Sequence, residues 1–214
     1  MVPRKVRVKK ILWETEDVFT LELVPEDYEL DEFNFKPGQF NMLYAFGVGE
    51  AAISISSDSV KKSSILHTIH KVGYVTSALS KLKKGDVVGL RGPFGKAWPL
   101  EEVKGYDICL MAGGIGLAPL RPSIYYKQYD KFTLLYGARS PRDMLYPVEL
   151  EQWAKKYDIH IETTVDRADG TWRGQVGVVT ELMEYAEIDA AKTRALVCGP
   201  EIMMKYAIDS LKNK

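Results

Sequence analysis

The residues best placed to do chemistry form a glycine turn in the second half of the chain. The turn follows the apolar run 107–112 and contains Gly113, Gly114 and Gly116, with Pro119 shortly after it. Glycine lacks a Cβ, so its backbone N–H can come close to a ligand, and proline suits the first turn of a helix. A glycine turn leading into a helix N-terminus favours an anion such as a dinucleotide pyrophosphate. A purely structural turn fits the same residues, because the last glycine of the dinucleotide fingerprint is replaced by proline.

A second candidate anion site lies in the first half, where Gly73 precedes the helical pattern 76–83. Thr76 stands at the expected N-cap, and such a helix start leaves N–H groups for an anion. A simple capped helix accounts for the same residues. Farther along, residues 92–95 read Gly-Pro-Phe-Gly, which predicts a loop lying against a flat ligand or another domain.

The elements that must position the second site are short antiparallel strands. Apolar and polar residues alternate, and turn signals separate the runs. We expect strands near residues 6–8, 19–23, 40–46, 51–57, 65–71 and 86–90. Many short strands of this kind favour a small closed or nearly closed antiparallel β-barrel.

The elements that must position the glycine turn are alternating strands and helices, which begin at about residue 103. Strands are expected at 107–112, 132–136, 159–165 and 195–198. Two helices are predicted by apolar stripes that we interpret as core faces, namely Val148, Leu150, Trp153, Ala154 and Tyr157, and Ile202, Met203, Tyr206, Ala207 and Leu211. This alternation predicts an α/β domain with a parallel sheet, whose ligands lie beyond the carboxyl ends of its strands.

The expected strand ends all carry unusual residues. They are the glycine turn, the run 136–145, Asp166-Arg167 and Cys198-Gly-Pro200. Gathered at one edge of a sheet, they favour a binding cleft.

Composition excludes several classes of function. Lys+Arg and Asp+Glu both number 29, which argues against nucleic acid as the partner. No apolar run approaches the roughly 20 residues of a membrane span, and no signal peptide is evident. Cys109 and Cys198 sit in apolar runs and are interpreted as buried thiols of a reducing, cytoplasmic compartment. No cysteine or histidine cluster has the spacing of a metal or iron–sulfur site. Scarce Asn and Gln beside abundant Lys and Glu fit a heat-adapted source.

The motifs, in their order, resemble the ferredoxin–NADP reductase superfamily along essentially the whole chain. The resemblance rests on Lys-Pro-Gly-Gln-Phe40, Ile53-Ser-Ile-Ser56, Gly73-x-Val-Thr76, Arg-Gly-Pro-Phe-Gly95, Ala-Gly-Gly-Ile-Gly-Leu-Ala-Pro119, Tyr-Gly-Ala-Arg139 and Cys-Gly-Pro200. Within the superfamily, the chain is most similar to NAD(P)H-linked flavin subunits of cytosolic hydrogenases and of anaerobic sulfite reductase and dihydroorotate dehydrogenase systems.

The resemblance implies a flavin-binding β-barrel over residues 1–99 and an NAD(P)-binding α/β domain over residues 100–214. It implies an oxidoreductase that moves hydride between the nicotinamide and FAD, and single electrons to or from an iron–sulfur or hydrogenase-type partner. Two alternatives remain open. One is a non-catalytic subunit without flavin that serves a structural or nucleotide-sensing role, and the other is a stand-alone flavin reductase.

The resemblance also implies the residues of the flavin site. The isoalloxazine would be lined by Ile53, Ser54 and Ile55, with the Ser54 hydroxyl near N5 as a catalytic group. The ribityl and phosphate part would follow Ile69, His70 and Lys71, and the pyrophosphate would lie on Gly73, Val75 and Thr76.

In the second domain, the resemblance places the nicotinamide nucleotide. Its pyrophosphate would meet the glycine turn, Gly113, Gly114 and Gly116, with Pro119 in the helix that follows. Arg139 and Asp143 would contact its ribose or phosphate groups. Cys198, as a second catalytic group, would face the nicotinamide together with Gly199 and Pro200.

The chain departs from the superfamily pattern in three places. Ala51-Ala-Ile-Ser54 stands where Arg-x-Tyr-Ser is commonest, so His70 or Lys71 would have to supply the positive charge, and FAD or FMN both remain open. The related subunits continue into a cysteine cluster that holds a 2Fe–2S centre, whereas this sequence stops at Lys214. It would therefore be a shortened form, or its electrons would leave another way.

The third departure concerns the choice of nucleotide. Asp166 would repel the 2′-phosphate of NADP, while Arg139, Arg142 and Arg167 would attract it. We favour NAD.

Three further residues attract notice without carrying the prediction. His67 and His160 are interpreted as packing or surface histidines, not as catalytic groups. Trp172, in the run 170–174, fits a cleft aromatic or a loop anchor equally well.

Overall fold

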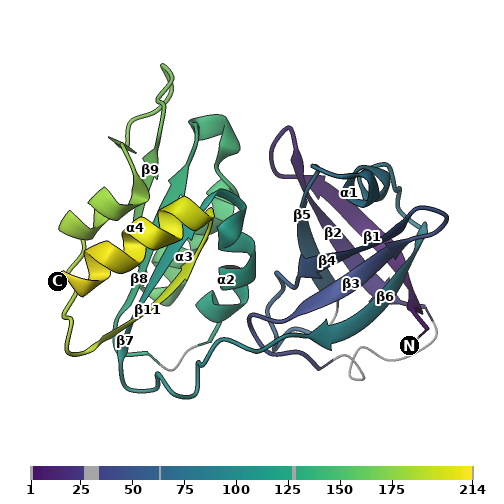
Figure 1. Ribbon diagram of the computed structural model, residues 1–214, viewed down its shortest axis with the longest axis horizontal. Coiled ribbons are helices and arrows are strands. Elements are labelled where there is room, and N and C mark those ends of the chain that lie inside the picture. Colours follow the sequence, from purple (N-terminus) through teal and green to yellow (C-terminus); the bar gives the residue numbers. More distant parts are fainter. Residues whose placement is uncertain (1, 27–33, 63, 127–128, 214) are drawn as a thin grey trace. The chain divides into compact units, whose positions relative to one another are not determined.

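The computed structural model describes residues 2–26, 34–62, 64–126 and 129–213. The chain divides into two compact units, shown in Figure 1. Unit 1 comprises Met1–Trp98 with Arg121–Tyr125, and unit 2 comprises Pro99–Leu120 with Tyr126–Lys214. The sequence predicts a flavin-binding domain over residues 1–99 and an NAD(P)-binding domain over residues 100–214. This division of the chain by ligand stays a prediction.

Unit 1 is built on a six-stranded antiparallel sheet in the order β4-β3-β6-β1-β2-β5. The strands are β1 Arg4–Trp13, β2 Val18–Pro25, β3 Phe40–Ala45, β4 Gly49–Ser54, β5 Ile65–His70 and β6 Val87–Phe94. The edge strands β4 and β5 lie side by side but form no hydrogen-bonded ladder with each other. The predicted antiparallel β-barrel is thus confirmed as a barrel-like sheet with one seam.

The sheet curls because one face of nearly every strand is apolar and must leave water. The buried core of unit 1 consists of Val6, Val8, Phe19, Leu21, Leu23, Leu43, Ala45, Ile55, Ile65, Ile69, Leu79, Val88 and Leu90. Leu79 comes from α1, Tyr74–Leu79, the helix that packs on β3 and β4 (Figure 1). The helix predicted over residues 76–83 therefore begins two residues earlier and ends four residues earlier.

The predicted Gly-Pro-Phe-Gly loop lies mostly within β6, so the expectation of a loop was wrong, while its contact with a flat ligand or another domain stays a prediction. Phe94 is the last residue of the strand and pairs with Phe40 of β3, with ring centroids 5.9 Å apart. Gly92 has a φ of +143°, and a Cβ there would overlap Asn41 Oδ1. The glycine is therefore required by packing inside the sheet, which sequence alone could not distinguish from a ligand-facing loop.

Unit 2 is built on a five-stranded parallel sheet in the order β10-β9-β8-β7-β11. The strands are β7 Asp107–Gly113, β8 Phe132–Ala138, β9 His160–Val165, β10 Gln175–Val176 and β11 Thr193–Cys198. Short 3₁₀ turns occur at η2 Gly114–Gly116, η3 Pro141–Asp143 and η4 Val179–Glu184. The predicted α/β domain with a parallel sheet is confirmed.

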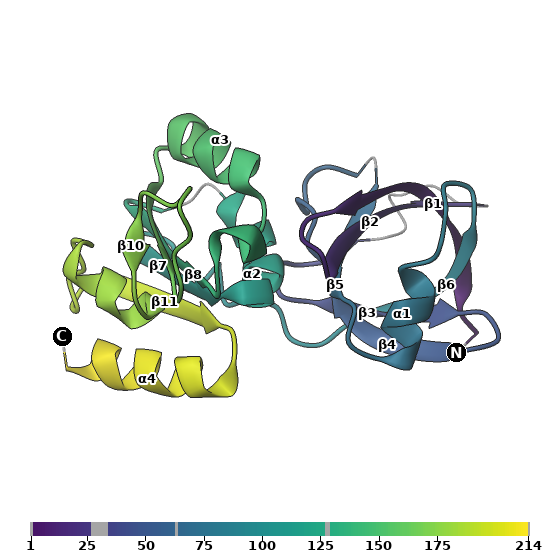
Figure 2. The same cartoon turned by 90° about the horizontal axis from the view of Figure 1, so that it is seen from above.

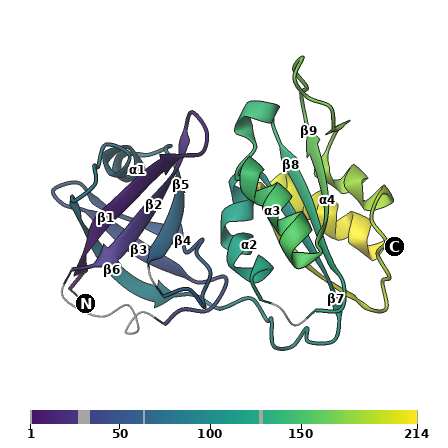
Figure 3. The same ribbon diagram turned by 180° about the vertical axis from the view of Figure 1, so that it is seen from behind.

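Helices cover both faces of the parallel sheet. Figures 2 and 3 show α2 (Leu117–Ile124) and α3 (Pro147–Tyr157) on one face, and α4 (Glu201–Lys212) on the other. On the α4 side, one buried cluster joins the sheet to η4 and α4 and includes Cys109, Met111, Leu135, Val179, Leu182, Met183, Ala186 and Ala207. No helix in the described ranges is both long and apolar enough to span a bilayer.

The two apolar stripes were only partly interpreted correctly. Leu150, Trp153 and Ala207 are buried, but Val148 is 67% exposed, and Ile202 and Tyr206 are each 60% exposed. On α4 the small side chain of Ala207 packs on the sheet side. Ile202 and Tyr206 therefore share the helical spacing of the stripe but face outward.

Candidate functional site

The carboxyl ends of the parallel strands gather the predicted nucleotide-binding segments of unit 2. In the strand register Cys198 lies opposite Ala112, Gly113 opposite Gly137, and Ala138 opposite Val165. The chain leaves β7 toward β8 on one side, while β11 flanks β7 on the other. Such a reversal of strand order is where open α/β sheets bind ligands. The glycine turn after β7 and the Cys198-Gly-Pro200 segment after β11 lie on the two sides of this reversal.

The three glycines of the turn have different surroundings. A Cβ on Gly116 would overlap the Cys198 carbonyl, and one on Gly113 would lie 2.5 Å from Met203 Sδ. These two glycines make room for neighbouring protein. Gly114 instead has a φ of +53° and nothing within 4 Å in the direction of a Cβ. Of the three predicted contacts to a pyrophosphate, Gly114 alone borders open space through its Cα.

The helix after the turn begins as the sequence predicts. A single 3₁₀ turn, η2, leads directly into α2, and Pro119 is the third residue of that helix. Its missing N–H is one of those that a helix start leaves without an internal partner. Contact between Pro119 and a nucleotide stays a prediction.

The loops after β8 and β9 form an open pocket of about 550 Å³. Its lining residues are Arg139, Ser140, Asp143, Asp166 and Arg167. Backbone hydrogen bonds tie the loops together, since Asp166 N–H donates to Ala138 O at 2.9 Å and Arg167 N–H to Arg139 O at 3.0 Å. The predicted residues Arg139 and Asp143 thus share a pocket with Asp166. Its mixture of carboxylates and guanidinium groups suits the hydroxyl and phosphate groups of a nucleotide.

Both cysteines are free thiols. Burial raises the pKa of Cys109 to about 12. Burial also raises the pKa of the half-buried Cys198, although the Gly199 N–H opposes this shift. Cys198 therefore carries its proton at neutral pH, and any role at a nicotinamide would be that of a neutral contact.

The predicted flavin residues of unit 1 lie along the seam between β4 and β5. Ile53 and Ser54 end β4, while Ile69 and His70 end β5. The side chains of Ile55 and Ile69 are each only 1% exposed and belong to the core. Only their backbone can face a ligand, so the expected lining by these two side chains is not supported.

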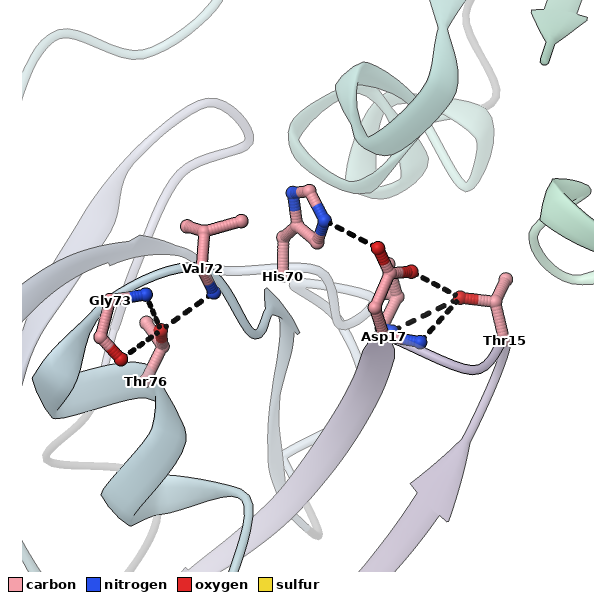
Figure 4. Close-up of polar contacts among 7 residues, drawn as sticks. Thr15, Asp17, His70, Val72, Gly73 and Thr76 are labelled. Carbon is pink, nitrogen blue, oxygen red and sulfur yellow. Dashed lines mark hydrogen bonds and ion pairs between the residues drawn. The ribbon is translucent and has the colours of Figure 1, made fainter.

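The start of α1 differs from its prediction in one respect. Gly73, with φ −132° and ψ 179°, is the N-cap, and Thr76 is the third residue of the helix. The Thr76 hydroxyl accepts the N–H groups of Val72 at 3.1 Å and Gly73 at 3.0 Å (Figure 4). Val75 packs beside Gly49 at the start of β4, where its Cγ2 would lie 3.4 Å from a Cβ on that glycine. The N–H groups left for an anion are those of the first helical turn.

His70 has a hydrogen-bond partner that the sequence did not reveal. Its Nε2 lies 2.8 Å from Asp17 Oδ2, and Thr15 Oγ1 donates to Asp17 Oδ1 at 3.0 Å (Figure 4). Burial would raise the pKa of Asp17, but hydrogen bonds from His70 and Thr15 outweigh it and lower that pKa. The Asp17 carboxylate thus compensates any charge on His70. Lys71, by contrast, extends its Nζ to 5.8 Å from the centre of the Trp13 ring.

The remaining histidines and Trp172 have the structural surroundings expected of packing residues. His67 is fully buried, and burial lowers its pKa to about 4. His160 is exposed and lies 3.2 Å from Glu162. Trp172 is a loop anchor, because its Nε1 donates to Gln175 O at 2.8 Å and its ring closes on Gly174. Within the described ranges, no group of three or more His, Cys, Asp or Glu side chains could hold a metal ion.

Comparison with known proteins identifies the family. The model of the oxidoreductase NAD-binding domain matches residues 110–209. Sulfhydrogenase 2 subunit gamma of Pyrococcus furiosus is 33% identical over 227 residues, covering 99% of this chain and 78% of the relative. Sulfhydrogenase 1 subunit gamma of the same organism is 37% identical over 220 residues, covering 98% and 74%. A probable dihydroorotate dehydrogenase B (NAD(+)) electron transfer subunit of Methanocella arvoryzae is 35% identical over 219 residues, covering 99% and 74%.

The chain belongs to this family of hydrogenase gamma and dihydroorotate dehydrogenase electron-transfer subunits. The predicted resemblance is confirmed, and so is the prediction of an oxidoreductase that transfers electrons in connection with NAD(P)H.

Solved structures share the fold at low sequence identity. The flavohem-like FAD/NAD binding domain of nitric oxide dioxygenase from Vibrio cholerae has a TM-score of 0.83 at 20% identity, covering 100% of this chain and 94% of that one. A ferredoxin NADP+ reductase from Neisseria gonorrhoeae, solved with bound FAD and NADP, has a TM-score of 0.79 at 20% identity, covering 98% and 90%. These similarities confirm the two-part fold.

Proposed function

We propose that the chain is an FAD-dependent NAD(P)H oxidoreductase that serves as the electron-transfer subunit of a larger enzyme. The observation that carries the proposal is the seam of unit 1. Two strand edges face each other there without a ladder, and the start of α1 lies beside one of them. Unpaired strand edges are normally covered or joined in a β-protein, so a seam of this kind favours a flat ligand with polar edges.

The residues along the seam fit a flavin in two respects. The hydroxyl of Ser57, just beyond β4, is buried and without a partner among the described residues, as expected of a group that a ligand would satisfy. The first turn of α1 offers N–H groups to a phosphate. Lys71 is the better substitute for the arginine of the superfamily pattern, because Asp17 already compensates His70.

When bound, a flavin supplies the chemistry of accepting hydride and releasing single electrons. The chain's own residues bind and orient. Ser54 would present its hydroxyl toward the ring, and Gly114 would admit the nucleotide pyrophosphate near the start of α2. Arg139 and Asp143 would hold ribose or phosphate groups, and Cys198 would contact the nicotinamide as a neutral thiol.

NAD is the proposed nucleotide. Asp166 lines the pocket directly after the end of β9. A carboxylate at that position repels a 2′-phosphate and can accept hydrogen bonds from ribose hydroxyls.

The proposed electron partner is an acidic iron–sulfur protein. A groove of about 380 Å³ on unit 1 is lined by Lys9, Lys10, Ile11, Trp13, Ser80, Leu82, Lys83 and Lys84. A register shift in β1 between Val8 and Lys10 marks a bulge, and both Lys9 and Lys10 are exposed. Lys9 is paired with Glu22 at 2.8 Å, so the positive charge of the groove rests on Lys10, Lys83 and Lys84. In a chain that is neutral overall, this concentration of charge favours a partner with a negative surface.

The test is anaerobic mixing of the FAD-loaded protein with NADH and NADPH separately, following the visible absorbance of the flavin. Bleaching by NADH at a higher kcat/KM than by NADPH is expected. A protein that stays colourless after incubation with FAD would favour the second candidate, a subunit without flavin. The run Ala51-Ala-Ile53, which replaces the usual arginine and tyrosine, motivates this candidate. Reduction of free flavin with no preference for an iron–sulfur acceptor would indicate a stand-alone flavin reductase.

A further inference from the structure

The peptide that joins Ser54 to Ile55 is held from both sides at the edge of β4. Its N–H, on Ile55, donates to Gln39 O at 3.0 Å. Its carbonyl, on Ser54, lies 3.0 Å from Nδ1 of His67, a side chain of β5. At this point the seam is thus bridged by an imidazole where a closed barrel would have a backbone N–H.

The hydrogen-bond partners of His67 define its tautomer. A carbonyl can only accept, so the Nδ1 that contacts Ser54 O must carry a proton. The other nitrogen, Nε2, lies 3.2 Å from Nδ2 of Asn41, an amide nitrogen that can only donate. Nε2 is therefore unprotonated, and the ring is neutral. The low pKa of His67, caused by burial, agrees with this assignment.

Asn41 is itself held in place by packing. Its side chain is completely buried, and its Oδ1 faces the Cα of Gly92, where a Cβ would overlap it. That oxygen has no hydrogen-bond partner among the described residues. In this orientation the amide nitrogen of Asn41 faces Nε2 of His67.

The seam has little else to fix it near Ser54. The next bridge is the N–H of Ser56, which donates to Leu66 O at 2.8 Å, and the hydroxyl of the same Ser56 lies 3.0 Å from the Thr68 hydroxyl. On the other side of Ser54, the described residues of β4 and β5 share no backbone ladder, and the backbone of Ile53 also bonds to His67. His67 stands at the last bridge before the seam opens.

We propose that His67, oriented by Asn41, is a positioning residue for the flavin site. It fixes the Ser54–Ile55 peptide at the end of β4 that would face the flavin ring. The inference rests on the proposed flavin function and adds two buried residues to it. Neither side chain touches the ligand. Their effect passes through the Ser54 carbonyl, which sets the direction of the Ser54 hydroxyl and of the strand edge.

The experiment compares His67→Leu with His67→Gln, which retains a donor and an acceptor, and with His160→Leu as a control on an exposed histidine of unit 2. The readouts are the Kd for FAD from flavin fluorescence, the flavin midpoint potential, and the melting temperature of the apoprotein. We expect His67→Leu to weaken FAD binding about tenfold and to shift the potential, as loss of one buried hydrogen bond would. His67→Gln should recover most of both effects, and His160→Leu should change neither.

Two outcomes separate this inference from the function beneath it. If the unaltered protein binds no FAD, both are overturned. If it binds FAD, but a folded His67→Leu protein keeps the original Kd and potential, only the role of His67 is overturned. Should His67→Leu fail to fold, Asn41→Ala decides, because it leaves His67 in place but removes the donor to Nε2. An unchanged Kd and potential in that variant would equally refute the inference.

Discussion

Alanine at Gly116 should destabilise the protein much more than alanine at Gly114, although both glycines belong to the same turn. At Gly116 the added Cβ would lie 2.5 Å from the carbonyl carbon of Cys198 and 2.8 Å from Gly199 Cα. Ordinary contact begins near 3.4 Å. The Cys198 carbonyl oxygen would be closer still, so the end of β11 and the residue after it would have to move by more than 0.9 Å. The atoms that must move are backbone, which has no rotamer to change.

The magnitudes decide the sign at each position. Gly116 does not have a positive φ, so alanine there would stabilise by about 0.4–1 kcal/mol if the space were free, because it restricts the unfolded chain. Overpacking against backbone opposes this with about 3 kcal/mol, the upper end of the usual range. At Gly114 nothing obstructs the Cβ, but a φ of +53° costs a non-glycine residue about 1 kcal/mol. We expect Gly116→Ala to be less stable than Gly114→Ala by roughly 1–2 kcal/mol.

The assay is unfolding of the two variants and the parent protein, without nucleotide, together with KM for NADH. Gly116→Ala should show the larger loss of stability. Gly114→Ala should fold and raise KM, because its methyl group would occupy the space proposed for the pyrophosphate. The reasoning fails if Gly116→Ala is at least as stable as Gly114→Ala, since the turn would then be free to move away from Cys198.

Four further predictions follow from single groups. Asp166→Ser should raise the ratio of kcat/KM for NADPH to that for NADH about tenfold, measured by flavin bleaching, since one repulsive charge is removed. Lys71→Gln should weaken FAD binding several-fold, and the effect should shrink in high salt if Lys71 supplies the missing charge. Lys84→Glu should slow reduction of an acidic ferredoxin at low salt but not of neutral benzoquinone, while Lys205→Glu on α4 should slow neither. In the folded protein His67 has a pKa of about 4, against an ordinary value of 6.5. As the pH falls, the unfolded chain therefore takes up the proton first, and the free energy of unfolding should fall by about 3 kcal/mol between pH 6.5 and pH 4. In His67→Gln, urea unfolding at several pH values should lack that portion of the slope.

The fold could be predicted from the sequence because its two halves have different periods. Alternation with period two requires a half-buried sheet, and a strand followed by a helix requires a parallel one. These patterns depend on many residues, so errors at single positions cancel. The exposed Ile202 and Tyr206 show where such patterns fail. A helical stripe tells which residues share a face of the helix, but not that the face with the small Ala207 packs closest to the sheet.

The partners of individual charged side chains could not be predicted in the same way. His70 was expected to be available to a phosphate, yet Asp17, which lies 53 residues away in sequence, pairs with it. The two meet because β2 and β5 are neighbours, with Val18 opposite His70 in the register. Pairing of that kind depends on strand order and register, which no local pattern determines. The same is true of His67, whose partners come from β3 and β4.

The glycine turn shows that a motif can be recognised before the role of each of its glycines is known. A missing Cβ signals that something comes close, but the sequence does not say whether that neighbour is a ligand or the protein. Here Gly113 and Gly116 admit the segment after β11, and Gly114 alone borders open space. The two roles are nevertheless linked, because the segment admitted by Gly116 begins with Cys198, the residue proposed to face the nicotinamide. The packing of this segment against Gly116 therefore sets the position of Cys198 relative to the space beside Gly114. A substitution at Gly116 should disturb nucleotide binding by displacing Cys198, whereas one at Gly114 should disturb it by direct contact with the nucleotide.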